Sequence, residues 1–166
     1  MKRAVVVAVA LGLIVGAVQT FAQAKPSFTG KWTVVPDPNA PAPAAGRGGG
    51  RGGRGGGLGQ EFLAAQTEKT LVVTTTGPNG EQKATYNLDG SESKNPITFG
   101  DNTIDRVSKV KWDGAKLVIA TTTNSNGNAN ESTQTCSLDA TGNLVVESTN
   151  NFQGTPTTTK ATYKKS

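Results

Sequence analysis

The 166-residue sequence contains no histidine and only one cysteine, Cys136. Without histidine the chain has no Ser-His-Asp or Cys-His catalytic arrangement, and it offers no imidazole ligand for zinc. Its 12 acidic residues are scattered mainly over turns and polar stretches, without the recurrent pairing that a two-carboxylate hydrolase needs. The sequence therefore predicts a protein that is not an enzyme and that uses no metal or other cofactor.

The single cysteine also excludes an intramolecular disulfide. Cys136 alternates with Gln134 and Leu138 along one face of an expected strand. We interpret it as a buried, unreactive thiol, because free cysteine is among the most buried residue types. The other interpretation, a nucleophile, requires a nearby base, and the chain has no histidine to supply one.

Aromatic residues make up only 5% of the chain and apolar residues 34%, which is lean for a globular domain. Threonine is frequent instead, with runs at 74–76, 121–123 and 157–159. Its β-branched carbon suits the half-exposed surface of a sheet and disfavours helix. The composition predicts one all-β domain with a small core.

The N-terminus has the three parts of a secretory signal: Lys2 and Arg3, an apolar run over 4–18, and Ala-Gln-Ala at 22–24. We expect cleavage after Ala24. An uncleaved anchor is the alternative, but about 15 apolar residues are short of the roughly 20 that span a bilayer. No cysteine follows the run to accept a lipid. The mature protein is therefore expected to be periplasmic or secreted, without a membrane span.

Residues 36–57 break the pattern of strands with a Pro/Ala run followed by an Arg/Gly-rich run. Such a composition buries too little apolar surface to offset the entropy of ordering it, so we expect a disordered loop. Removing Lys2 and Arg3 leaves 15 basic against 12 acidic residues, a net charge of +3. The three arginines of this loop, Arg47, Arg51 and Arg54, account for all of that charge.

Arg-Gly-Gly segments can follow phosphates and stack on bases. Three arginines are a weak electrostatic footprint, however, and export removes the usual nucleic-acid partner. We therefore expect no nucleic-acid binding. The predicted organisation is a signal peptide over 1–24 and a single domain over 25–166, interrupted by the loop at 36–57.

The stretch 111–123 shows two β-rich arms meeting at Asp113-Gly114, a pair that favours a two-residue hairpin turn. A polar turn is expected at 124–130. Residues 60–66 fit a short helix by propensity or a strand, and we prefer the strand because a three-residue turn then leads into the next one. Eight strands are expected at 27–35, 70–76, 81–88, 104–112, 116–123, 131–138, 144–152 and 157–164, and the segments 61–66 and 97–99 bring the number to ten.

This pattern predicts an antiparallel up-and-down meander that forms a barrel of eight to ten strands, enough to close around packed side chains or one small ligand. The opening Phe28-Thr29-Gly30-Lys31-Trp32 resembles the Gly-x-Trp start of lipocalins and fatty-acid-binding proteins, the calycin group of barrels. The segment 86–93 is also similar to one in small secreted bacterial proteins with this opening. The resemblance implies that Gly30 and Trp32 close one end of the barrel, with Trp32 under a basic side chain from a late strand: Lys160, Lys164 or Lys165.

Two polar stretches suggest sites by composition alone. Residues 89–96 carry hydroxyls and carboxylates, but Ser and Asp are common in turns because their side chains bond nearby backbone amides. Asp101, Asn102, Thr103 and Asp105 carry oxygens of the kind that calcium prefers, but they lack the spacing and the distal Glu of a calcium loop. We expect a turn in the first stretch and no metal site in the second.

Arg106 falls on the apolar side of the strand at 104–112. Such an arginine can hold an anionic head group through paired hydrogen bonds, although a cation that reaches water at the barrel rim is the interpretation we favour. With Tyr86 and Trp112 it makes the expected lining of a ligand site.

The sequence predicts an exported lipocalin-like barrel that binds a small apolar or amphipathic molecule. The alternative is a structural protein with no interior ligand, whose Thr/Asn-rich exterior contacts the cell envelope or a polysaccharide.

Overall fold

The computed structural model describes residues 24–36, 58–77, 80–99, 102–125, 127–152 and 155–166, and strands are the only regular elements within them. The expected signal, apart from Ala24, and the Arg/Gly-rich run with Arg47, Arg51 and Arg54 lie outside the described residues. The strands are β1 (Gly30–Val34), β2 (Glu61–Gln66), β3 (Thr70–Gly77), β4 (Gly80–Asn87), β5 (Ser93–Lys94), β6 (Ile97–Phe99), β7 (Asn102–Asp113), β8 (Lys116–Ser125), β9 (Asn128–Leu138), β10 (Leu144–Phe152) and β11 (Thr155–Lys165).

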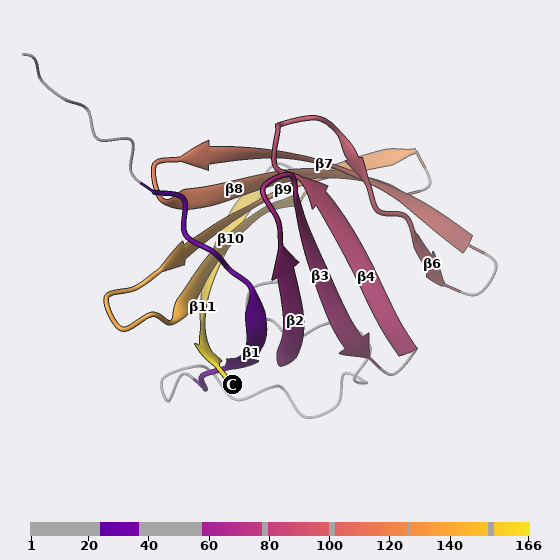
Figure 1. The fold of residues 1–166 in the computed structure, drawn as a ribbon. Helices are drawn as coiled ribbons and strands as arrows, with labels where there is room; N and C mark the ends of the chain where they lie inside the picture. Colours follow the sequence, from indigo (N-terminus) through magenta and orange to yellow (C-terminus); the bar gives the residue numbers. More distant parts are fainter. Residues whose placement is uncertain (1–23, 37–57, 78–79, 100–101, 126, 153–154) are drawn as a thin grey trace, which may run out of the picture.

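Ten of these strands form one continuous antiparallel path in the order β4-β3-β2-β1-β11-β10-β9-β8-β7-β5, and β6 pairs with β7 off this path. Most neighbours in the sheet are also neighbours in the chain, and the first strand pairs with the last, so the sheet curls into a nearly closed barrel (Figure 1). The predicted antiparallel meander and its strand number are confirmed. The architecture is also the one that the calycin resemblance implies.

The structure confirms the strand preferred for 61–66, which is β2, so the helix alternative is wrong. It corrects two other local predictions. The hairpin turn lies one residue later than expected: Asp113 pairs with Lys116, and Gly114 takes the left-handed φ of 58°. β8 and β9 remain paired to Ser125 and Asn128 through most of the expected polar turn, because pairing with a neighbouring strand overrides a weak local preference.

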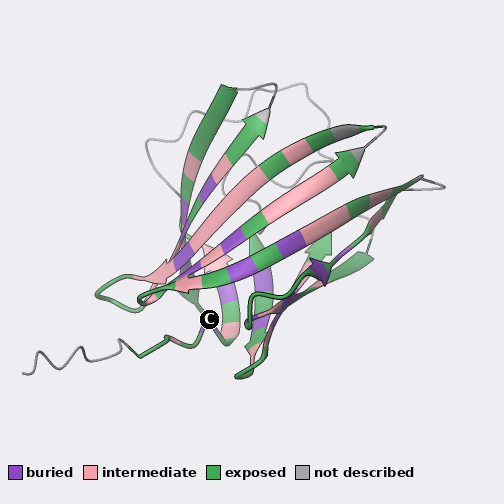
Figure 2. Cartoon of the chain, turned by 90° about the horizontal axis from the view of Figure 1, so that it is seen from above, coloured by how far each residue is buried: buried purple, intermediate pink, exposed green. Residues whose placement is uncertain are grey.

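Alternation along the strands builds the core at one end of the barrel, where buried segments of the long strands gather (Figure 2). Trp32 and Tyr163 are at most 1% exposed, and the Trp32 indole donates a hydrogen bond to the Phe28 carbonyl at 2.8 Å. Phe62 packs edge-on against Tyr163 with ring centres 5.1 Å apart. A few aromatic residues therefore suffice for the core, because Phe28, Trp32, Phe62 and Tyr163 are all buried in it.

Residues paired across neighbouring strands share one face of the sheet, and the inner face of β7–β11 changes along the barrel. The apolar row is Trp112, Leu117, Cys136, Val146 and Ala161. The next row is mixed: Val110, Ile119, Gln134, Ser148 and Thr159. Beyond it lie two rows that we call the polar inner rows: Ser108, Thr121, Ser132, Asn150 and Thr157, then Arg106, Thr123 and Asn130.

Gly30 and Lys165 complete the packing around Trp32. Trp32 and Lys165 are paired residues of β1 and β11, and the Lys165 Nζ lies 5.8 Å from the centre of the indole ring. Gly30 has a φ of 149°, and a Cβ at this position would collide with the Lys165 side chain. Of the three lysines that the resemblance offered, Lys165 is the one over Trp32.

Side chains close the seam between β4 and β5. The Asn95 side chain accepts a hydrogen bond from the Thr85 N–H at 2.8 Å and donates one to the Thr85 carbonyl at 3.0 Å. The Ser93 hydroxyl accepts from the Asn87 N–H at 2.8 Å. On the other side, the Asn95 N–H donates to the Arg106 carbonyl at 2.8 Å. The Asn95 side chain thus bonds the backbone of β4, while the Asn95 N–H bonds the backbone of β7.

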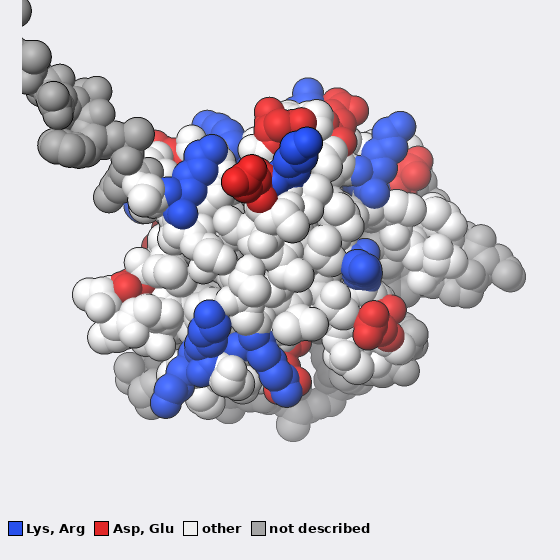
Figure 3. All heavy atoms as spheres, viewed as in Figure 1, with Lys and Arg blue, Asp and Glu red and all other residues white. Residues whose placement is uncertain are grey.

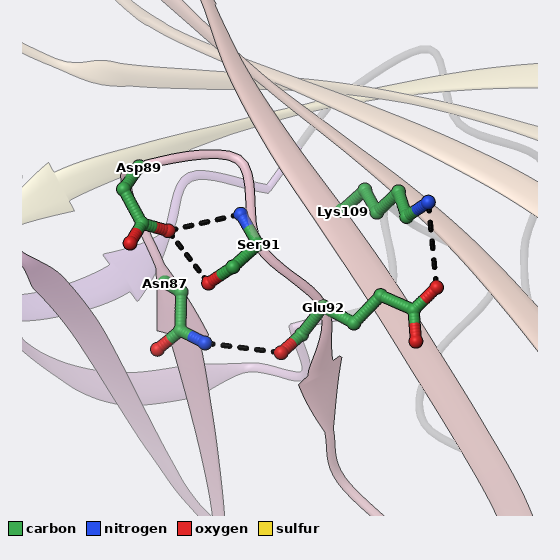
Figure 4. A network of polar contacts seen from close by, with 5 residues as sticks. All are labelled: Asn87, Asp89, Ser91, Glu92 and Lys109. Atoms are coloured by element: carbon green, nitrogen blue, oxygen red, sulfur yellow. Dashed lines mark hydrogen bonds and ion pairs between the residues drawn. The ribbon is translucent and has the colours of Figure 1, made fainter.

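The connection that delivers Asn95 is a hydrogen-bonded turn (Figure 4). The Asp89 carboxylate accepts from the Ser91 N–H at 2.9 Å and from its hydroxyl at 2.6 Å, and these bonds lower the pKa of Asp89. Asn87 donates to the Glu92 carbonyl at 3.0 Å, and Glu92 pairs with Lys109 at 3.3 Å. The polar residues of this stretch organise a turn, as predicted, although the stretch also contains the short strand β5.

Substituting Gly30→Ala should lower the free energy of unfolding by about 1–3 kcal/mol, because it adds backbone strain and a collision with Lys165. Urea denaturation of the purified protein measures this. In a Lys165→Ala background the collision is gone, so the same substitution should cost less. An equal cost in both backgrounds would contradict the role assigned to Lys165.

Substituting Asn95→Ala should destabilise the protein by about 1–3 kcal/mol, because the Thr85 N–H and carbonyl lose their partners at a partly buried seam. Lys94→Ala, on the exposed neighbour, is the matched control and should stay within about 0.5 kcal/mol of wild type. Thermal and urea unfolding report both. Equal stabilities for the two variants would show that the seam does not depend on Asn95.

Candidate functional site

A cavity of about 350 Å³ lies beyond the Asn95 bridge, bordered by β3, β4, β6 and β7. Its volume is at the lower end of the range for small-molecule sites. In Figure 1 the strands that border it are β4 and β6, on either side of the seam, with β7 behind them. The polar, uncharged side chains and the arginine that line it are Thr75, Gln82, Tyr86, Asn95, Thr98 and Arg106.

Arg106 is the half-buried charge in this wall. Its Nη2 donates a hydrogen bond to the Tyr86 hydroxyl at 3.3 Å, while its Nε is inaccessible to water and has no hydrogen-bond partner in the described part of the chain. No described carboxylate pairs with Arg106, since the ion pairs within the described ranges are formed by lysines. An unsatisfied buried donor costs about 1–3 kcal/mol. The guanidinium is therefore a charged group at the cavity wall without a counter-ion among the described residues.

Tyr86 reaches the same wall because β4 alternates inward and outward. Tyr86 is 3% exposed, and Ala84 and Leu88 share its inward face, as the sequence predicted. Tyr86 also borders the core, so its ring separates the cavity from the packed end of the barrel and its hydroxyl faces Arg106. Accepting from Arg106 leaves its own O–H available as a donor.

Glu81 and Lys83 also border the cavity, and both are exposed. Because exposed charges are screened by water and salt, they contribute less to the field inside the cavity than Arg106 does. On the face drawn in Figure 3, basic and acidic groups are both found along the upper edge, and basic groups gather at the lower edge near the C-terminus.

The packed end of the barrel has almost no free space. The cavity among its side chains is about 20 Å³, room for about one water molecule. Phe28, Phe62 and Leu144 are among the side chains that fill it. A ligand in the larger cavity therefore cannot extend an apolar chain into this core.

Trp112 lies away from the cavity. Its ring stacks on Phe28 with 6.0 Å between centres and 8° between planes, and the Lys25 Nζ lies 5.5 Å from the ring centre. The structure thus brings Tyr86 and Arg106 together and leaves Trp112 at the apolar end, where a ligand role stays a prediction. Asn95 lines the cavity but was missed, because the sequence shows it only as part of a turn.

Cys136 is 5% exposed, and burial raises the pKa of its thiol to about 12. This agrees with the inert thiol predicted. Within the described ranges, no group of three or more acidic or cysteine side chains is placed to hold a metal ion. Nor does that part of the chain include a helix long and apolar enough to cross a membrane.

Comparison with known proteins does not assign a function. No protein-family model matches the chain, and no curated protein matches it. What the protein does is therefore inferred from the cavity and its side chains.

At pH 8 a thiol with a pKa of about 12 is almost entirely protonated, so Cys136 should not react with Ellman's reagent in the native state and should react fully in concentrated urea. A Cys136→Ser, Ser137→Cys variant moves the thiol to the outward, half-buried neighbour and should react in the native state. Rapid native labelling of the wild-type protein would contradict the burial of Cys136.

Proposed function

We propose that this protein is an exported, lipocalin-like barrel that binds a small amphipathic molecule, with Arg106 and Tyr86 holding its acidic group. The observation that carries this proposal is the Arg106 guanidinium, which borders a cavity of about 350 Å³ and has no carboxylate partner in the described part of the chain. The signal-like N-terminus supports the export part of the proposal. On this proposal the protein binds its ligand without transforming it.

The recognition chemistry follows from the two side chains. A guanidinium presents two of its N–H groups as a fork that matches the two oxygens of a carboxylate. Because the Arg106 Nε is buried, its two Nη groups are the ones placed for this role. Tyr86 already fixes the Arg106 Nη2 at 3.3 Å, and its hydroxyl hydrogen can serve as a further donor. Because the group is half-buried, the attraction is stronger than it would be in bulk water.

The rest of the cavity wall supports a small ligand with a short apolar part. Leu58, Val73, Ala84 and Ile97 contribute apolar contacts beside the polar groups. The filled core beyond Tyr86 limits how far the apolar part can extend. These features favour the amphipathic class over a long, wholly apolar ligand.

A structural role, with an exterior that contacts the cell envelope or a polysaccharide, is the competing proposal. It gives no account of the Arg106 donors at the cavity wall. We therefore place ligand binding first, and the absence of any bound acid in the experiment below would put the structural role first.

Substituting Arg106→Met should weaken binding of a short acid such as hexanoate by roughly 10- to 100-fold, because hydrogen bonds to a charged group contribute about 1.5–3 kcal/mol. Isothermal titration calorimetry measures this. Lys111→Met removes an exposed cation from the outward face of the same strand and should leave the affinity unchanged. Equal affinities for wild type and Arg106→Met would refute the role of Arg106.

A further inference from the structure

Arg106 belongs both to the cavity wall and to the polar inner rows. Its partner across β8 is Thr123, which pairs in turn with Asn130 of β9. Side chains paired in this way share one face, with Cβ atoms about 4.5–5.5 Å apart. Thr123 and Asn130 do not line the cavity, but they place a hydroxyl and an amide on the inner face next to Arg106.

Several groups of the polar inner rows have open hydrogen-bonding capacity. The Ser108 and Thr121 hydroxyls bond each other at 2.8 Å. By contrast, the side chains of Thr123, Asn130 and Ser132 are half-buried and make no hydrogen bond to another described residue. In the adjoining mixed row, Ser148 is 3% exposed and its hydroxyl has no partner in the described part of the chain.

The part of the cavity wall that β3, β4 and β6 supply is also polar. Thr75 and Gln82, from β3 and β4, line it, and Thr98 of β6 lines it on the far side of the seam. The Thr75 hydroxyl makes only a long contact of 3.5 Å to the Gln82 carbonyl. Each of these side chains offers both a donor and an acceptor, which is the pattern that complements a hydroxyl group.

The size of the cavity sets the size of the ligand. A cavity of about 350 Å³ lies at the lower end of the range for small-molecule sites, which suits a ligand of the size of a monosaccharide. An alkyl acid of the same size would cover the threonine, asparagine and glutamine groups without satisfying them, which lowers its affinity.

We propose that the acid bound at Arg106 is a polyhydroxylated carboxylic acid of the sugar-acid class, an inference that rests on the proposed function. Its carboxylate binds Arg106 and Tyr86. Its neighbouring hydroxyls bind Thr75 and Gln82, which line the cavity, and Thr123, which lies beside Arg106 on the inner face of the sheet. The source is either a free sugar acid or the end of an acidic polysaccharide, since both present the same carboxylate and hydroxyls.

Calorimetric titration of the purified exported protein with galacturonate, hexanoate and glucose tests this inference. Galacturonate should bind at least tenfold more tightly than hexanoate, which has the carboxylate but no hydroxyls, and than glucose, which has hydroxyls but no carboxylate. Trigalacturonate identifies the source: tighter binding than galacturonate assigns the polysaccharide end, and equal or weaker binding assigns the free sugar acid.

Matched valine variants separate the hydroxyl contacts from the fold. Thr75→Val and Thr123→Val should each weaken galacturonate binding several-fold and leave hexanoate binding unchanged. Thr74→Val and Thr122→Val change the outward-facing neighbours, which are half-buried to a similar degree, and should change neither affinity. Thermal unfolding of all four variants checks that they fold.

The outcomes distinguish this inference from the proposed function. If hexanoate binds as tightly as galacturonate and Arg106→Met abolishes hexanoate binding, the sugar-acid inference is overturned while the acid-binding function stands. If Thr75→Val and Thr123→Val leave galacturonate affinity unchanged, the polar groups face only water and the inference is likewise overturned. If neither acid binds, both fail.

Discussion

The barrel depends on the side chain of Asn95. A sheet that curls on itself must join its first and last edges, and an unjoined edge exposes a row of unpaired backbone groups. Here the side-chain amide of Asn95 supplies both the donor and the acceptor for the backbone of Thr85, while the Asn95 N–H bonds the Arg106 carbonyl of β7. Because a side-chain bridge spans a wider gap than direct backbone hydrogen bonds, β4 and β7 need not pair with each other. The cavity lies next to this bridge, since Asn95 is one of its lining residues.

The two ends of the barrel serve different purposes. At one end Trp32, Tyr163 and Phe62 exclude water, and Lys165 covers the indole of Trp32. At the other end the inner face carries hydroxyls, amides and Arg106. Concentrating the few large side chains at one end stabilises the sheet and leaves the other end free to carry groups that would weaken a core.

Much of this arrangement could be predicted from the sequence, because strand alternation is a local signal. Alternation alone placed Tyr86 and Arg106 on inward faces, and turn residues located most hairpins. The Asn95 bridge could not be predicted, since it depends on how two strands from different hairpins meet across the barrel. For the same reason the sequence did not show that Arg106 lacks a carboxylate partner, or that Trp112 packs on Phe28 away from the cavity.

The pairing of β1 with β11 has a consequence for how the chain folds. Trp32 and Lys165 are partners in the sheet although most of the chain separates them. The β-hairpins of the sheet form from segments that are neighbours in the chain. The β1–β11 pairing instead joins two distant segments, so its formation carries the entropic cost of closing a long loop. Such nonlocal pairings slow folding. The pairing that joins β1–β4 to β7–β11 is therefore a late event, and a nascent chain that has not yet released β11 keeps the edge of β1 open.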